Sequence, residues 1–141
     1  MKTFKVLIKV GVFLFVSYLL FSYYPKYSYL YYVNNGDTIT QINLDSWYYQ
    51  DLGRKTWFVR GQYDNKKIPE NNYIQIKYDF SNGYRGAINW VNSVPVFYFS
   101  NSENRFFSVN IKGDPRMKVI NMPDNEYYSK YKEAIYFIGA P

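Results

Sequence analysis

The chain has 141 residues, a formal net charge of +6, and neither cysteine nor histidine. Residues 1–26 contain four lysines and no acid, so the other residues hold 13 basic and 11 acidic side chains, a net charge of only +2. This weak excess argues against nucleic acid as a partner, because such surfaces need a clustered basic face. The length fits one ordinary domain and a short leader.

The first feature along the chain is an apolar stretch at residues 6–24, which contains a single charged side chain, Lys9. A helix rises about 1.5 Å per residue, so these 19 residues would come close to the roughly 30 Å hydrocarbon thickness of a bilayer. Lys9 lies in the first turn, from where its ammonium group can reach the headgroups. We therefore expect residues 1–26 to be a signal anchor with a transmembrane helix at about 6–24.

The charges around this stretch predict its orientation. Three lysines lie at its start and only Lys26 follows closely, so the positive-inside bias puts the N-terminus in the cytoplasm. We expect a single-pass protein of the cell membrane, bound to lipid through this helix, with its C-terminal part extracytoplasmic (periplasmic in a cell with two membranes). The expected residues at the membrane interface are Lys9, Tyr23, Tyr24 and Tyr27.

Two other interpretations of the stretch stay open. A cleaved signal peptide needs small residues just before the cut, whereas Ser17 and Ser22 have bulky neighbours such as Tyr18 and Phe21. A buried core helix of a soluble protein would also be apolar. The missing small residues favour an uncleaved anchor.

An aromatic segment at residues 27–36 follows and would lie beside the membrane. Tyr27, Tyr29 and Tyr31 alternate and would share one face of an extended chain, so we expect an interfacial segment that passes into a strand. The turn sequence Asn-Asn-Gly-Asp at residues 34–37 ends it. Residues 37–141 would then form the extracytoplasmic domain.

This domain is expected to be mainly β (α+β), with a small antiparallel sheet, because short apolar runs alternate with turn residues. Two strands are predicted at residues 38–44 and 56–63, with a turn at residues 51–55. Residues 73–91 alternate apolar and polar side chains around a turn at residues 81–83. That pattern predicts a hairpin that pairs Ile74 with Trp90 and Ile76 with Ile88.

Residues 93–113 predict a second hairpin around a loop at residues 101–104, in which Val96 would pair with Val109. Pro95 cannot donate a hydrogen bond to a ladder. Its strand should therefore lie at a sheet edge, or its first residues should be irregular.

The last segment, residues 124–138, carries helix signals. Asp124 can serve as N-cap and Gly139 can stop the helix. Four apolar residues fall at helical spacing and would pack on the sheet: Tyr127, Tyr131, Ile135 and Ile138. The alternative is a final strand in the aromatic and β-branched run at residues 134–138.

The residue types present leave little catalytic chemistry. Without histidine and cysteine, triads built on imidazole or thiol and the usual zinc sites are excluded, and no glycine-rich phosphate motif occurs. We expect no catalytic residue, no cofactor and no metal ion. A carboxylate pair such as Asp45 and Asp79 could hydrolyse a glycoside, but isolated acids in strands and turns are more often solvated surface residues.

The aromatic content is the remaining signal, with 18 tyrosines and three tryptophans. A β core will absorb most of these rings, but aromatic side chains are also enriched at interfaces. In residues 45–58 two tyrosines are adjacent and cannot both point inward from an extended chain. The candidate binding surface there consists of Trp47, Tyr48, Tyr49, Arg54 and Trp57.

Two functions are compatible with this sequence. The first is a membrane-anchored, non-catalytic domain that binds another protein of the envelope, in assembly or in immunity. The second is a module that binds glycan or peptidoglycan, and an envelope hydrolase is a weaker third. A flat exposed patch at Trp47 and Trp57 would favour a protein partner. A groove lined by an aromatic ring and rimmed by Asn and Asp would favour a sugar.

Overall fold

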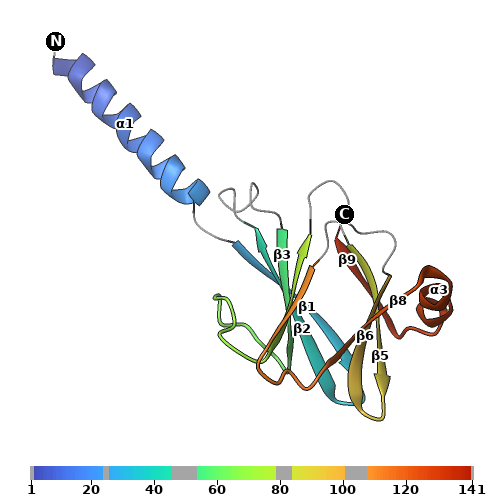
Figure 1. Ribbon diagram of the computed structural model, residues 1–141. Helices are drawn as coiled ribbons and strands as arrows, with labels where there is room; N and C mark the ends of the chain where they lie inside the picture. The colour runs from blue at the N-terminus through green and yellow to red at the C-terminus, as the bar shows by residue number, and fades with distance from the viewer. Residues whose placement is uncertain (1, 24–25, 46–53, 79–83, 101–107, 141) are drawn as a thin grey trace.

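The computed structural model describes residues 2–23, 26–45, 54–78, 84–100 and 108–140, as an N-terminal helix followed by a β domain (Figure 1). The elements in chain order are α1 Lys2–Tyr23, β1 Lys26–Asn34, β2 Asp37–Asp45, β3 Arg54–Arg60, β4 Tyr73–Tyr78, β5 Tyr84–Val91, β6 Val94–Ser100, β7 Ser108–Lys112, β8 Lys118–Met122, α3 Asp124–Lys132 and β9 Tyr136–Ala140.

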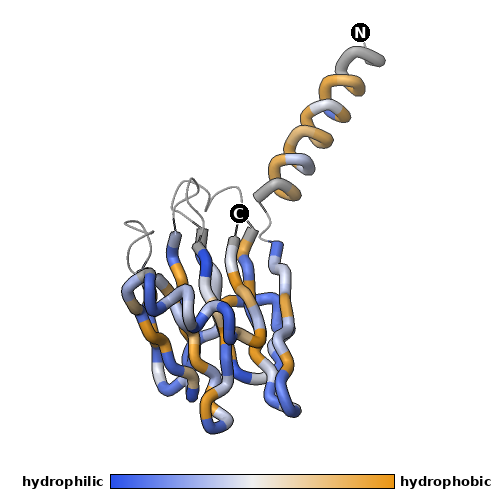
Figure 2. Tube along the Cα trace, turned by 90° about the vertical axis from the view of Figure 1, so that its right-hand side faces the viewer, coloured by the Kyte–Doolittle hydropathy of each residue, from blue (hydrophilic) through white to orange (hydrophobic). Residues whose placement is uncertain are grey.

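The predicted N-terminal helix is confirmed as α1, which begins before the apolar stretch, at Lys2. Figure 2 shows it as a largely apolar tube that stands apart from the β domain. A membrane-spanning helix was expected at this position. Within the described residues, no helix combines the length and the apolar character that crossing a membrane requires.

The domain consists of two sheets that pack face to face. One has five strands in the order β1-β2-β3-β4-β7, and the other has four in the order β8-β6-β5-β9. All described pairings are antiparallel except that of β6 with β8. The expected mainly β (α+β) class is confirmed, but as two sheets instead of one.

The core lies between the sheets, where alternating side chains of both inner faces meet. Phe58 of β3 and Phe97 of β6 contact each other edge to face across this layer, with ring centroids 4.9 Å apart. Each large apolar side chain buried in this way contributes about 1.5–3 kcal/mol. The buried members of the core are Ile39, Phe58, Ile74, Ile76, Tyr78, Ile88, Phe97, Phe99, Met117 and Ile138.

The first predicted hairpin is wrong, because β4 and β5 belong to different sheets. Ile74 pairs with Phe58 of β3 and Ile111 of β7, whereas Trp90 of β5 pairs with Pro95 of β6. The alternation was interpreted correctly, since Ile74 and Ile76 do point into the core. Two apolar stripes can meet edge to edge in one sheet or face to face between two, and this chain uses the second arrangement. The predicted turn at residues 81–83 lies outside the described residues.

The second predicted hairpin is also wrong. Val96 of β6 pairs with Asn89 of β5 and, in parallel, with Lys118 of β8, whereas Val109 lies in the other sheet. Pro95 therefore belongs to an inner strand. Both alternatives for Pro95 are therefore wrong, because β6 is not an edge strand and its first residues pair in register with β5. The missing donor is tolerated since Pro95 precedes the ladder to β8.

The C-terminal segment contains both of the predicted alternatives, a helix and then a strand. Helix α3 ends at Lys132, and Ile138 belongs to β9 in the core. Asp124 is the first helical residue and not the N-cap, which is Pro123. Tyr127 is buried against the outer face of the four-stranded sheet, with Tyr131 partly buried beside it, as the helical spacing predicted.

Candidate functional site

Of the five residues of the predicted aromatic surface, only Trp57 has a side chain that the structure describes. Trp57 lies in β3 with only 2% of its surface exposed, so it is an interior residue and the prediction that it is exposed is wrong. Arg54 begins β3, and nothing is described of its side chain. The remaining members, Trp47, Tyr48 and Tyr49, lie outside the described residues.

Trp57 lies on the outer face of the five-stranded sheet, and the chain after β3 folds back over part of that face, at Thr40. The Thr40 hydroxyl donates to the Gly61 carbonyl (2.6 Å) and accepts from the Tyr63 amide (3.1 Å). Tyr29, on the same face, has a buried hydroxyl close to the Lys66 backbone. An outer face that sequence alternation assigns to solvent is therefore partly covered.

The predicted membrane-interface residues lie along α1 and at the start of β1. Lys9 is exposed on α1, and Tyr27 is half-buried in β1. Tyr23 ends α1, with no description of its side chain, and Tyr24 is outside the described residues. Beside them, the Lys26 ammonium lies 5.9 Å from the ring centre of Phe21, a cation–π distance.

An interfacial segment that passes into a strand was expected at residues 27–36, and the structure has the edge strand β1 there, Lys26–Asn34. Within the described chain β1 pairs only with β2, and its Val33 carbonyl accepts a 2.5 Å hydrogen bond from the Tyr136 hydroxyl. Leu30, Tyr31 and Val33 are 49%, 44% and 51% exposed. Charged side chains and proline usually protect an edge strand from pairing with another chain. Neither occurs in β1 between Tyr27 and Val33.

Two tight turns lie at the end of the domain away from α1 (Figure 1). Asn35 and Gly36 connect β1 to β2 with φ of 49° and 81°, which confirms the turn predicted at residues 34–37. Asn92 and Ser93 connect β5 to β6 with φ of 50° and 62°. Two positive φ values in a two-residue loop are typical of type I′ hairpin turns, which favour Asn and Gly.

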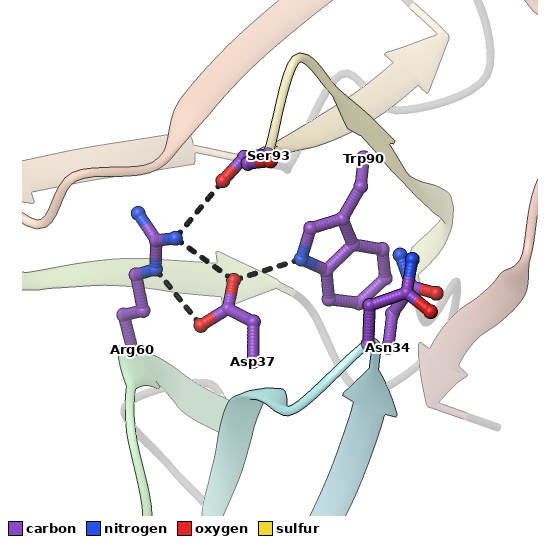
Figure 3. Close-up of a pocket in the computed structure, with 6 residues that line it drawn as sticks. Asn34, Asp37, Arg60, Trp90 and Ser93 are labelled. Carbon is purple, nitrogen blue, oxygen red and sulfur yellow. Dashed lines mark hydrogen bonds and ion pairs between the residues drawn. The ribbon is translucent and has the colours of Figure 1, made fainter.

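A polar network joins the two sheets between these turns (Figure 3). The Asp37 carboxylate accepts hydrogen bonds from Arg60 Nε (3.0 Å) and from Trp90 Nε1 (2.8 Å), and it forms an ion pair with Arg60 Nη2 (3.0 Å). Asp37 and Arg60 belong to the five-stranded sheet, whereas Trp90 belongs to the other. The bond from Trp90 to Asp37 therefore joins the two sheets, and the bidentate pair with Arg60 holds the carboxylate in position.

The network lowers the pKa of Asp37. Partial burial of the carboxyl acts to raise its pKa, but the hydrogen bonds from Arg60 and Trp90 and the positive charge of Arg60 outweigh this effect. Asp37 is therefore ionised at neutral pH, and the pair carries no net charge.

Arg60 also holds two strained backbone positions. Its guanidinium donates to the carbonyls of Ser93 (2.9 Å) and Arg116 (3.1 Å), both of which have positive φ. Such conformations are costly for side chains other than Gly and persist where surrounding contacts compensate. Arg60 thus fixes the shape of this end of the domain.

A pocket of about 190 Å³ lies beside the network and is lined by Asn34, Asn35, Asp37, Arg60, Trp90 and Ser93 (Figure 3). Trp90 is half-buried and contacts Tyr136 edge to face, with ring centroids 6.0 Å apart. The side chains of Asn34, Asn35 and Ser93 make no hydrogen bond to another described residue. They remain available to a ligand.

No pattern in the sequence indicates this pocket. Its only local signal was the turn at residues 34–37, and Trp90 was assigned to a hairpin stripe. The described residues contain no group of three or more acids that could hold a metal ion, and the pocket has one carboxylate, which Arg60 occupies. Glycoside hydrolysis uses two carboxylates, and the described lining of this pocket contains one.

Comparisons with protein-family models, curated proteins and solved structures found no match.

Proposed function

We propose that this protein is a membrane-anchored, non-catalytic binding protein whose β domain lies outside the cytoplasm and binds another protein of the envelope. The observation that carries the proposal is the exposure of the apolar side chains of α1. Its large apolar side chains are between 37% and 74% exposed, beside a β domain that has a closed core of its own.

An apolar helix with this exposure needs an apolar environment. The β domain does not supply one, since α1 stands apart from it (Figure 2). A helix that is apolar on all sides is typically buried in lipid or in a large core. The proposed anchor comprises the whole apolar stretch of the sequence, residues 6–24, which extends beyond the described part of the helix.

The support for a protein partner is the edge strand β1. An uncharged edge with exposed apolar and aromatic side chains can accept an extended segment of another chain, which adds a strand to the sheet. Antiparallel pairing of two copies through β1 would place their α1 helices at opposite ends of the shared sheet. One membrane could not hold both helices, so we propose a different protein as the partner.

The anchor can be tested by fractionation of cells that express the full chain. We expect the protein in the membrane fraction after an alkaline wash and in solution only with detergent. A Leu14→Lys/Phe15→Lys variant should leave the membrane, because lysine at the centre of a bilayer costs about 2.5–3.5 kcal/mol. The matched control, Ile111→Lys/Ile120→Lys, changes exposed apolar residues of the β domain and should stay with the membrane. Wild type in the soluble fraction would contradict the proposal.

The orientation can be tested with one introduced cysteine, because the natural chain has none. Ser129→Cys lies on the exposed side of α3. A membrane-impermeant maleimide should label this cysteine in unlysed cells whose wall or outer membrane has been made permeable or removed. Labelling only after lysis would mean that the β domain is cytoplasmic.

The partner can be tested with a photo-crosslinking amino acid at Tyr31 on β1. We expect a discrete protein adduct in living cells. The same residue at Tyr128, which is 51% exposed on α3, is the control and should give no such adduct. Equal crosslinking at both positions, or none at Tyr31, would count against the edge as the binding surface.

A further inference from the structure

We propose that the pocket beside Asp37 and Trp90 binds one ring of a neutral sugar, as part of a glycan that extends into solvent. This site is separate from the exposed middle of β1 and goes beyond the protein-binding role proposed above. It lies at the opposite end of β1 from α1, so an anchored domain would present it away from the membrane (Figure 1).

The charge of the pocket selects a neutral ligand. Its lining contains one acid and one base, and these form a bidentate ion pair whose side chains are only 24% and 28% exposed. A charged ligand would have to compete for Arg60 or Asp37 and would leave the other ion without its partner, which is strongly unfavourable for a partly buried pair. Phosphates, carboxylates and cations are therefore poor ligands.

The hydrogen-bonding groups that remain suit hydroxyls. Asn34 and Asn35 each offer an amide oxygen that accepts and an amide nitrogen that donates, and the Ser93 hydroxyl can do both. A sugar hydroxyl is likewise both a donor and an acceptor. Three such side chains lie at one pocket without hydrogen bonds to other described residues, so they can bind neighbouring hydroxyls without first breaking a contact.

Trp90 supplies the apolar part of the site. Its Nε1 is held by Asp37 and its ring by the edge contact with Tyr136, so the orientation of the indole is fixed before any ligand binds. A rigid ring of this size offers apolar contact area at a low cost in conformational entropy. The C–H face of a sugar ring is a suitable surface to pack against it.

The volume limits the ligand to about one ring. Drug-sized ligands occupy pockets of roughly 300–1,000 Å³, whereas this pocket has about 190 Å³. The rest of a longer glycan would extend into solvent from this end of the domain.

The test is a titration of the detergent-solubilised full chain with chitotetraose, cellotetraose and maltotetraose, followed by tryptophan fluorescence and calorimetry. We expect saturable binding of at least one of these sugars, and loss of the fluorescence change in Trp90→Phe. The double variant Asn34→Ala/Asn35→Gly should weaken binding at least tenfold. Glycine at position 35 keeps the positive φ of the turn, so the fold should be retained.

Ser93→Gly and Asn92→Gly form a matched pair. Both residues have positive φ in the same turn, but only Ser93 lines the pocket. Ser93→Gly should weaken sugar binding several-fold and Asn92→Gly should leave it unchanged. Equal effects of the two would overturn the assignment, as would binding that survives in Asn34→Ala/Asn35→Gly.

Absence of binding by all three sugars would also overturn the sugar proposal. So would a protein adduct from a crosslinker at Asn35, because a protein would then be the occupant. The membrane proposal is measured separately by fractionation of the same protein. Failure of either proposal can thus be recognised without the other.

Discussion

The indole nitrogen of Trp90 donates a 2.8 Å hydrogen bond to the carboxylate of Asp37, and this bond joins the two sheets of the domain. The two residues are 53 positions apart in the chain. Their contact fixes the wall of the pocket and helps to position the turn that carries Asn34 and Asn35. The stability of the fold and the shape of the candidate site therefore depend on the same carboxylate.

Replacement of Asp37 by Asn should destabilise the protein by about 1–3 kcal/mol. The variant leaves the Arg60 charge without its ion pair in a partly buried position. The free energy of unfolding, measured by denaturant titration, should fall accordingly. The control is Glu70→Gln, whose carboxylate is exposed and makes only a long 3.8 Å ion pair with Lys67. If both variants lost the same unfolding free energy, the interactions of Asp37 between the sheets would contribute no more to stability than an exposed ion pair.

The same carboxylate predicts a loss of stability in acid. The pKa of Asp37 in the folded protein lies below its ordinary value, so its stabilising effect is present above the ordinary pKa of about 4. The effect is lost as pH falls below that value and through the lower folded pKa. The difference in unfolding free energy between wild type and Asp37→Asn should therefore shrink between pH 5 and pH 2. A difference that stayed constant over this range would show that ionisation of Asp37 does not contribute.

Gly86 of β5 should not tolerate a larger residue. A Cβ atom at this position would lie 2.8 Å from Phe99 Cδ1 and 3.0 Å from Ile138 Cγ1, both in buried side chains. Gly86→Ala should lower the unfolding free energy by about 1–3 kcal/mol, since an overpacked core has to shift. Gly11→Ala in α1 is the control, because no atom lies within 4 Å of its added Cβ. Thermal unfolding should separate the two, and an unchanged melting temperature for Gly86→Ala would contradict the packing.

Tyr32 should ionise well above the ordinary pKa of a tyrosine. Burial raises the pKa of Tyr32 to about 12, and its hydroxyl donates to the Gln41 side chain at 2.7 Å. The folded pKa of Tyr32 is above the unfolded value of about 10, so protonated Tyr32 stabilises the fold. This contribution is complete below pH 10 and is lost as pH rises through about 12. NMR titration of tyrosine ring carbons, with Tyr32→Phe to assign the signal, would measure it. Ionisation near pH 10 in the folded protein would contradict the burial of this hydroxyl.

Features that depend on neighbouring residues could be predicted from the sequence. The N-terminal helix followed from an apolar run with one charged residue, the turn at residues 34–37 from Asn-Gly, and the inward direction of Ile74 and Ile76 from alternation. Each of these is set by backbone geometry and side-chain polarity within a few residues. Local sequence carries that information.

The neighbours of each strand were decided only by the tertiary structure. Alternation identifies the buried face of a strand but not the strand or sheet that covers it, so β4 was assigned to β5 when it pairs with β3 and β7. Trp57 is a second example, because it is buried on a face that alternation assigns to solvent, and the segment after β3 returns over part of that face. The pocket needs Asn35, Arg60 and Trp90 from three distant parts of the chain. The packing of two sheets brings them together, and the free energy of that packing depends on the whole core instead of on any local pattern.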